Sequence, residues 1–181
     1  HPNEEPIKGI KKMKQTDNFK FDEANVMNEL VYRNLSEDAK RQICAWKYGG
    51  EYDLYNLPSY EEMQVRQIGF MNPQRKKNYY GFWDESILVG FVNILEEKEE
   101  VFIGIGVNPD LCNKHYGQRM LLITYEISKK LYPDKPLYLE VRTWNIRAVK
   151  CYQKAGFRID GQAYELTTGI GTGTFYRMIR E

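Results

Sequence analysis

The segment from residue 137 to residue 157 constrains the fold most, because its hydrophobic period changes twice within it. Residues 137–142 alternate between apolar and polar, which predicts a half-buried strand. Residues 146–155 place their apolar side chains three and four apart, which predicts an amphipathic helix. Gly156 suits the left-handed position after a helix, and a strand pattern resumes at Phe157. The sequence therefore predicts a strand–helix–strand unit.

Three residues of this unit share one helical face. Asn145, Ala148 and Tyr152 are spaced three and four apart, and Asn145 stands where a side chain can cap the helix. A capped helix start beside a small residue and a phenol suits an extended ligand that carries amides. The other interpretation is a core-facing helix in which Asn145 is only a cap, and the pattern alone leaves both open.

Composition excludes several classes of protein. The 181 residues carry a net charge of +1 without a large basic block, which argues against a nucleic-acid partner. The longest apolar runs, such as residues 87–92, are too short to span a bilayer, so no membrane association is expected. Three cysteines without a CxxC pair and only two histidines make a metal site improbable, so none is predicted.

The length predicts one domain. With 42% hydrophobic residues, residues 27–181 can form one sizeable core. Residues 1–26 are polar and are expected to be an N-terminal arm or an added extension. No signal-peptide pattern is present and three thiols suggest a reducing compartment, so a cytoplasmic location is expected.

The same reasoning assigns elements to the rest of the chain. Strands are expected at residues 29–35, 78–83, 87–95, 101–107, 137–142, 157–163 and 174–179. Helices are expected at residues 36–48, 59–68, 118–131 and 146–155, the third with residues 120, 124, 127 and 131 inward. Loops are expected at residues 51–58, 108–117 and 167–173. The acidic residues 96–100 are interpreted as a solvated turn between strands rather than as a cation site.

The helical face described above carries a known motif. Its pattern, Asn-x-x-Ala-x-x-x-Tyr-x-x-x-Gly-Phe, is filled by Asn145, Ala148, Tyr152, Gly156 and Phe157. It resembles the last conserved motif of the GNAT superfamily of acyl-CoA-dependent N-acyltransferases, and the resemblance in element order extends over about residues 27–181. It implies an α/β fold with a mixed, mostly antiparallel central sheet of about seven strands flanked by about four helices.

A second family motif is only partly present. Members of the family carry Gln/Arg-x-x-Gly-x-Gly/Ala in a loop whose amides hold the CoA pyrophosphate at a helix N-terminus. Here Gly117 keeps the last glycine, while Cys112 replaces the basic or amide residue and His115 replaces the first glycine. His115 must then tolerate a positive φ, or it is a surface residue at the helix start. Cys112 is interpreted as a loop residue rather than as an acyl-carrying nucleophile.

The resemblance implies acetyl-CoA, or CoA, as the acyl-donor co-substrate. The implied contacts are Ile105, Val107, Cys112, Asn113, Lys114, His115, Tyr116, Gly117, Gln118, Asn145, Ala148 and Tyr152. The implied reaction is direct attack of a primary amine, on a small molecule or a peptide, with Tyr152 as general acid. A homodimer is possible.

The general base and the acceptor site are less defined. Many members of the family use a Glu on the strand before the pyrophosphate loop, but residues 101–107 contain no carboxylate. A water relay, a carboxylate from the loop of Glu51 and Asp53, or Glu140 must then serve as base, although Glu140 also fits a strand ion pair. The resemblance implies that residues 48–58 and 164–173 form the acceptor site. Within the first of these loops the candidate contacts are Glu51, Tyr52, Asp53 and Tyr55. The alternative to an enzyme is a CoA-binding sensor module that acts through a protein partner.

Overall fold

The computed structural model describes residues 30–181. Its strands are β1 (Val31–Asn34), β2 (Tyr79–Asp84), β3 (Ile87–Glu96), β4 (Val101–Val107), β5 (Leu137–Arg142), β6 (Arg158–Ile159), β7 (Tyr164–Thr168) and β8 (Gly171–Arg180). Its α-helices are α3 (Glu37–Ala45), α4 (Tyr60–Arg66), α5 (Tyr116–Leu131) and α6 (Ile146–Lys154). Short 3-10 segments lie at η2 (Gly50–Tyr55), η3 (Gly69–Met71), η4 (Lys76–Asn78) and η5 (Pro109–Leu111). The predicted arm at residues 1–26 lies outside the described part.

The eight strands form one mixed sheet in the order β1-β2-β3-β4-β5-β8-β6, with β7 also paired to β8. Only β4 and β5 run parallel, and the other pairings are antiparallel. Helix α5 packs on β3 and β4, and α6 packs beside α5. The predicted α/β fold with a mostly antiparallel sheet and four α-helices is therefore confirmed for residues 30–181.

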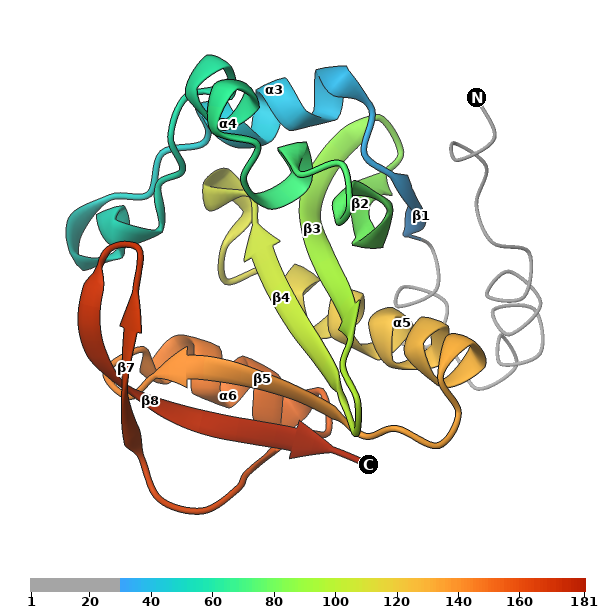
Figure 1. The fold of residues 1–181 in the computed structure, drawn as a ribbon, viewed down its shortest axis with the longest axis vertical. Coiled ribbons are helices and arrows are strands. Elements are labelled where there is room, and N and C mark those ends of the chain that lie inside the picture. Colours follow the sequence, from blue (N-terminus) through green and yellow to red (C-terminus); the bar gives the residue numbers. More distant parts are fainter. Residues whose placement is uncertain (1–29) are drawn as a thin grey trace.

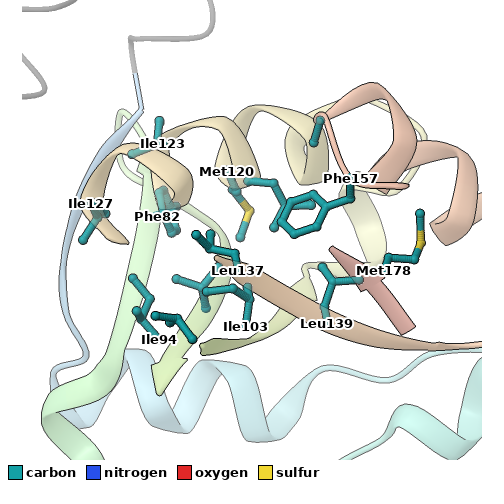
Figure 2. Close-up of a cluster of buried hydrophobic side chains, with 14 of the residues drawn as sticks. Phe82, Ile94, Ile103, Met120, Ile123, Ile127, Leu137, Leu139, Phe157 and Met178 are labelled. Atoms are coloured by element: carbon teal, nitrogen blue, oxygen red, sulfur yellow. The ribbon is translucent and has the colours of Figure 1, made fainter. Parts of the chain in front are cut away.

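Two apolar clusters hold these layers together. The larger lies between the sheet and the helices α5 and α6, and Figure 2 shows Met120 and Ile127 of α5 against Leu137 and Leu139 of β5. The smaller one joins α3 and α4 to β2 and β3, and Ile43 and Met63 are its buried helix residues. Both clusters leave β4 and β5 with one face toward α5 and the other toward the segment that follows α3.

The pairing between β4 and β5 is short. Their register has two residue pairs, Val101 with Leu137 and Phe102 with Tyr138. On its other side β4 stays paired to β3 along its whole length. Figure 1 shows β4 and β5 starting together and then diverging toward their carboxyl ends. The sheet is thus open at the carboxyl ends of its two parallel strands, where α/β folds commonly bind ligands.

Local sequence explains where the helices next to this opening begin. Asn145 caps α6, since its side-chain oxygen accepts a hydrogen bond from the N–H of Ala148 at 3.2 Å. Ser36 and Ser59 cap α3 and α4 in the same way. Helix α5 differs, because its N-cap residue His115 makes no side-chain capping bond. The first turn of α5 therefore keeps N–H groups that no cap side chain satisfies.

Several predicted boundaries were wrong. The expected loop at residues 167–173 is the turn of a hairpin formed by β7 and β8, and only two residues of the strand expected at 157–163 are in β6. Helix α5 begins at Tyr116 rather than at residue 118, so Gly117 lies inside its first turn. Leu131, which was expected to point inward, is 49% exposed.

The acidic turn at residues 96–100 is more structural than expected. Glu100 accepts two hydrogen bonds from the guanidinium of Arg177, and Lys135 pairs with Glu96 at 2.7 Å. Two of the carboxylates thus have cationic partners, so the prediction of a merely solvated turn was too simple. Within residues 30–181 no group of His, Cys, Asp and Glu could hold a metal ion. In that same part, none of the helices combines the length and the apolar character needed to cross a membrane.

Candidate active site

A cavity of about 440 Å³ lies between the start of α5 and the exposed face of α6, and we call it the helix-end cavity. It is lined by Ile105, Val107, Leu111, Cys112, Asn113, His115, Tyr116, Gly117, Gln118, Arg147, Ala148, Lys150, Cys151, Tyr152 and Lys154. Ten of the twelve residues expected to contact CoA are in this set. The two others are Asn145, which is buried, and Lys114, which is exposed.

The helix-end cavity is suited to an anion. The first turn of the 16-residue helix α5 faces it with N–H groups that lack a side-chain cap, and a helix N-terminus carries partial positive charge. Arg147, Lys150 and Lys154 of α6 add three cationic side chains, while none of the Asp and Glu residues within 30–181 lines the cavity. Phosphate groups are the anions that such a combination of amides and cations commonly binds.

The loop before α5 has an unusual backbone. His115 has φ 66° and Asn113 has φ 67°, so two residues adopt the left-handed conformation that usually favours glycine. His115 thus tolerates the positive φ that replacing a glycine was expected to impose. Asparagine and histidine are among the residues that enter this region most readily.

The two cysteines of the helix-end cavity look unsuited to nucleophilic chemistry. Burial raises the pKa of Cys151 to about 11, so it is a neutral thiol near pH 7. The sulfur of Cys112 lies 3.8 Å from the main-chain oxygen of Asn108. These contacts favour the interpretation of Cys112 as a loop residue.

A second cavity, of about 340 Å³, fills the opening between β4 and β5, and we call it the inter-strand cavity. It is lined by Ile43, Trp46, Tyr48, Tyr55, Leu57, Phe91, Phe102, Ile103, Gly104, Ile105, Gly106, Leu139, Glu140, Val141, Arg142, Tyr152 and Phe175. Most of these side chains are apolar or aromatic. The cavity therefore suits a ligand with an apolar body.

Tyr152 and Ile105 line both cavities. Within residues 30–181 the Tyr152 hydroxyl makes no hydrogen bond, and its half-buried ring packs against the main core. Burial raises the pKa of Tyr152 well above its ordinary value, with smaller contributions from Cys151 and Tyr55. A neutral phenol with an unused O–H donor thus stands where the two cavities meet.

Two tyrosines attach the segment after α3 to the opening. The Tyr48 hydroxyl donates to the main-chain oxygen of Val107 at 2.7 Å, and the Tyr55 hydroxyl accepts from the side-chain N–H of Asn145 at 3.1 Å. Their rings meet edge to face, with centroids 6.5 Å apart. This aromatic wall fixes one side of the inter-strand cavity relative to β4 and α6.

The other candidates from this loop lie outside the cavities. Glu51 and Asp53 are exposed and line neither cavity, so the structure does not bring Asp53 into the site as a base or an acceptor contact. Tyr52 packs against Trp144 at a centroid distance of 5.6 Å and lies under the guanidinium of Arg147. Of the four predicted acceptor contacts, only Tyr55 lines the inter-strand cavity.

Glu140 lines the inter-strand cavity, but its partner differs from the ion pair considered above. Its carboxylate accepts a hydrogen bond from the Tyr164 hydroxyl at 2.5 Å, and within residues 30–181 it has no cationic partner. Burial, and then this hydrogen bond, raise the pKa of Tyr164. The hairpin strand β7 thus reaches the site through Tyr164, which lies in the predicted acceptor segment.

Two positions near the site are glycine because a side chain would meet a different neighbour at each. A Cβ on Gly106 would lie 2.4 Å from the ring of Phe91, so this glycine makes room for a core ring rather than for a ligand. A Cβ on Gly117 would lie 3.0 Å from the sulfur of Cys151, at the contact between α5 and α6. Gly117 is therefore buried by helix packing as well as placed beside the helix-end cavity.

Sequence reasoning missed the cations of α6 and most of the inter-strand lining. Arg147, Lys150 and Lys154 are spaced three, four and seven apart, a signal that one helical face is basic. Arg142 follows Glu140 by two residues in a strand, so both were predicted to share a face. The aromatic residues Phe91 and Phe175 had no such signal, because they reach the cavity from distant strands.

Comparison with known structures identifies the fold. A spermidine N-acetyltransferase chimera from Vibrio cholerae and hSSAT has a TM-score of 0.67 at 20% identity, covering 84% of this chain and 95% of that chain. A GNAT-family acetyltransferase from Bacillus anthracis has a TM-score of 0.66 at 18% identity, covering 83% and 93%. The Vibrio cholerae spermidine N-acetyltransferase in complex with CoA and spermine gives 0.67 at 18%, covering 83% and 94%. At these identities the similarity shows a shared fold.

Sequence comparison identifies the family. The acetyltransferase (GNAT) family matches residues 40–157, which is more than half of the chain. Comparison with curated proteins finds no match. The chain belongs to the GNAT acetyltransferase family, and the resemblance seen in the Asn145–Phe157 motif is confirmed. It is an acyl-CoA-dependent N-acyltransferase, a class that uses acetyl-CoA and transfers its acetyl group to an amine.

Proposed function

We propose that the protein transfers an acetyl group from acetyl-CoA, bound in the helix-end cavity, to a primary amine that enters through the inter-strand cavity. The observation that carries this proposal is the position of Tyr152, which lines both cavities. An acyl donor and an amine held on either side would meet beside its hydroxyl. The sensor alternative gives no role to a second cavity that shares Tyr152 with the first.

The donor's phosphates would bind at the start of α5. The uncapped amides near Gly117 and the cations Arg147, Lys150 and Lys154 support this assignment, because together they compensate negative charge. The extended amide arm of CoA would lie along β4, where the side toward β5 has no strand partner from residues 30–181 beyond Phe102. Ile105 and Val107 would contribute main-chain groups there, as the resemblance implies.

In the reaction, the neutral amine nitrogen forms a bond to the thioester carbonyl carbon, and the carbon–sulfur bond then breaks. The amine loses a proton and the departing thiolate gains one. A thiol of ordinary pKa, near 8.5, is more acidic than the Tyr152 phenol, whose pKa is raised by burial. Full transfer from Tyr152 is therefore uphill, and its role is to donate a hydrogen bond that stabilises the developing thiolate.

The amine must reach the carbonyl without its extra proton. A lysine-like amine of pKa about 10.4 is about 10⁻³ neutral at pH 7, whereas an α-amine of pKa near 7.8 is neutral to roughly one part in seven. Glu140 is the carboxylate that lines the inter-strand cavity, so it is the proposed acceptor of the amine's proton. Tyr164 holds it in place. The three unpaired cysteines support the cytoplasm as the proposed compartment, and a homodimer stays a prediction.

Titration with acetyl-CoA, followed by an amine screen, tests this function. A ligand at 100 times its Kd should stabilise the fold by about 2.7 kcal/mol, measured as a higher melting temperature. Lys150→Gln with Lys154→Gln should weaken acetyl-CoA binding, whereas Arg158→Gln removes a positive charge that lines neither cavity and should not. An unchanged melting temperature at millimolar acetyl-CoA would contradict the proposal.

A further inference from the structure

The inter-strand cavity contains two charged side chains in an otherwise apolar and aromatic lining. These are Glu140 and Arg142, which stand two residues apart on the same face of β5. No ion pair joins them within residues 30–181, and the Glu140 carboxylate is already bound by Tyr164. Tyr164 is a neutral phenol and leaves the carboxylate charge in place, so the cavity holds one negative and one positive side chain, neither of them in an ion pair within residues 30–181.

The guanidinium of Arg142 lies over the ring of Phe175, 4.7 Å from its centroid. Arg142 is half-buried, and in the described part of the chain its guanidinium makes neither a hydrogen bond nor an ion pair. A second arginine on the same face of the sheet, Arg177, does have carboxylate partners. Arg177, which is paired in register with Glu140, binds the carboxylates of Glu100 and Asp160.

The contrast between the two arginines matters because a guanidinium stays charged at every accessible pH. A charge that is partly withdrawn from water is unfavourable until an opposite charge and hydrogen-bond acceptors meet it. Arg177 has such partners inside the protein. Within residues 30–181 the Arg142 guanidinium packs over the ring of Phe175 and beside Gly173 without a carboxylate partner, and Arg142 lines a cavity of about 340 Å³.

We propose that the acceptor carries a carboxylate as well as its amine, joined by an apolar or aromatic body, and that Arg142 binds this carboxylate. The proposal rests on the proposed function, because it names the substrate class of the same site. A guanidinium fork matches a carboxylate in two parallel hydrogen bonds. The aromatic wall of Tyr48 and Tyr55 and the ring of Phe175 would contact the apolar body.

This substrate class differs from polyamines. Spermidine and spermine carry several cations and no anion, so they need several carboxylates. Within residues 30–181 the cavity offers one carboxylate, which Tyr164 already binds, beside a guanidinium that repels cations. Arg142 is thus a specificity-determining residue that distinguishes amino acids with apolar side chains from simple amines and polyamines.

The test compares amines that differ only by a carboxylate. The pairs are L-phenylalanine with phenethylamine, L-leucine with 3-methylbutylamine, and 6-aminohexanoate with pentylamine, and spermidine is added as a polyamine. CoA release is measured with a thiol reagent. For at least one pair we expect kcat/KM to be about 100-fold higher for the carboxylate-bearing member, as a bidentate charge-assisted contact allows.

Variants show whether this preference depends on Arg142. In Arg142→Gln, kcat/KM for the two members of a pair should differ by no more than a few-fold. Arg142→Lys keeps the charge but loses the paired N–H donors of the guanidinium, so it should retain an intermediate preference. Arg158→Gln removes a positive charge at an exposed ion pair with Glu181 and should keep the full preference. Melting temperatures identify any variant that is merely unstable.

Two results would overturn the proposal. One is a wild-type enzyme that acetylates the carboxylate-free amines or spermidine as well as their partners, and the other is an Arg142→Gln variant with an unchanged preference. If no amine is acetylated, the proposed function fails and a binding readout decides the inference separately. In the presence of CoA, a melting-temperature rise with the carboxylate-bearing member alone, lost in Arg142→Gln, supports it. Equal or absent shifts reject it.

Discussion

The side-chain N–H of Asn145 donates a hydrogen bond to the Tyr55 hydroxyl at 3.1 Å, across 90 residues of sequence. The same Asn145 caps α6 through its oxygen, which accepts from the N–H of Ala148. One buried amide thus joins the aromatic wall of the inter-strand cavity to the helix that lines the helix-end cavity. The two bonds can be separated by substitution.

Tyr55→Phe should lose the bond to Asn145 and keep the cap of α6. In the proposed function we expect this variant to raise KM for the acceptor and to lower the free energy of unfolding by about 1 kcal/mol. Asn145→Ala loses both bonds and should cost about 1–2 kcal/mol. Asn145→Asp is the matched control, because its carboxylate can cap α6 and accept a hydrogen bond from the Tyr55 hydroxyl, so KM should stay near wild type. Chemical denaturation with steady-state kinetics measures each effect.

Tyr152→Phe should lower kcat by ten-fold or more while stability and acetyl-CoA affinity stay near wild type. The variant keeps the ring in the core and deletes a hydroxyl that has no hydrogen-bond partner within residues 30–181, so little stability is lost. Because burial raises the pKa of Tyr152, its hydroxyl keeps its proton below pH 10, and ionisation of Tyr152 should not limit activity in that range. A full-rate Phe variant would remove Tyr152 from the mechanism.

Gly117→Ala should destabilise the protein by about 1 kcal/mol, because the new Cβ would lie 3.0 Å from the sulfur of Cys151. Cys151→Ala removes that sulfur, so the double variant should be more stable than the sum of the single effects predicts. Urea unfolding of the four proteins gives this coupling energy. Strict additivity would show that the helices move apart instead. Gly117→Glu would disturb this buried contact further, so it should impair folding as well as acetyl-CoA binding.

His115→Gly should fold normally and gain up to about 1 kcal/mol, because glycine adopts the observed φ of 66° without a Cβ penalty. His115→Val should be destabilising, since a β-branched residue tolerates this conformation poorly. Measuring acetyl-CoA affinity in His115→Gly shows separately whether the His115 side chain contributes to binding. If His115→Gly binds as well as wild type, the backbone path of the loop carries the interaction, and a weaker affinity assigns a share to the imidazole.

Tyr32→Phe should be neutral or stabilising by up to about 1 kcal/mol at pH 7, because the buried Tyr32 hydroxyl lacks a hydrogen-bond partner within residues 30–181. Burial raises the pKa of Tyr32 above its ordinary 10.0, so the folded state favours the neutral phenol. The stability that comes from this difference in pKa is fully present below pH 10. It is lost as the pH rises further, because Tyr32 ionises in the unfolded chain but not yet in the folded one. Between pH 10 and 11.5 the variant should lose about 1.4 kcal/mol less per pH unit than wild type, as denaturation at each pH would show.

The sequence predicted the parts of the fold that depend on local pattern. Residues 137–157 gave the strand, the capped helix and the turn glycine, because period, cap and C′ position are encoded within a few residues. The hairpin of β7 and β8 was missed, since Thr167 to Gly173 is rich in glycine and threonine and its pairing depends on a neighbouring strand.

The two cavities of the candidate site also differ in how much of their lining a local sequence pattern can predict. Ten of the twelve residues named as CoA contacts line the helix-end cavity, because most of its lining comes from one continuous loop and two helix starts. The inter-strand cavity collects Ile43, Phe91 and Phe175 from α3, β3 and β8, and no local pattern relates these residues. Arg142 was overlooked because a missing ion-pair partner is visible only when every neighbouring side chain has been placed.

The early separation of β4 from β5 gives the protein an edge strand in its interior. From Ile103 onward, one side of β4 has no neighbouring strand within residues 30–181, as at the outer rim of an ordinary sheet. An exposed edge strand can pair with a further extended chain, and proteins commonly prevent this with bulky or charged side chains at the edge. Here the side chains that line the inter-strand cavity beside this edge are largely aromatic, so they hinder the addition of a further strand.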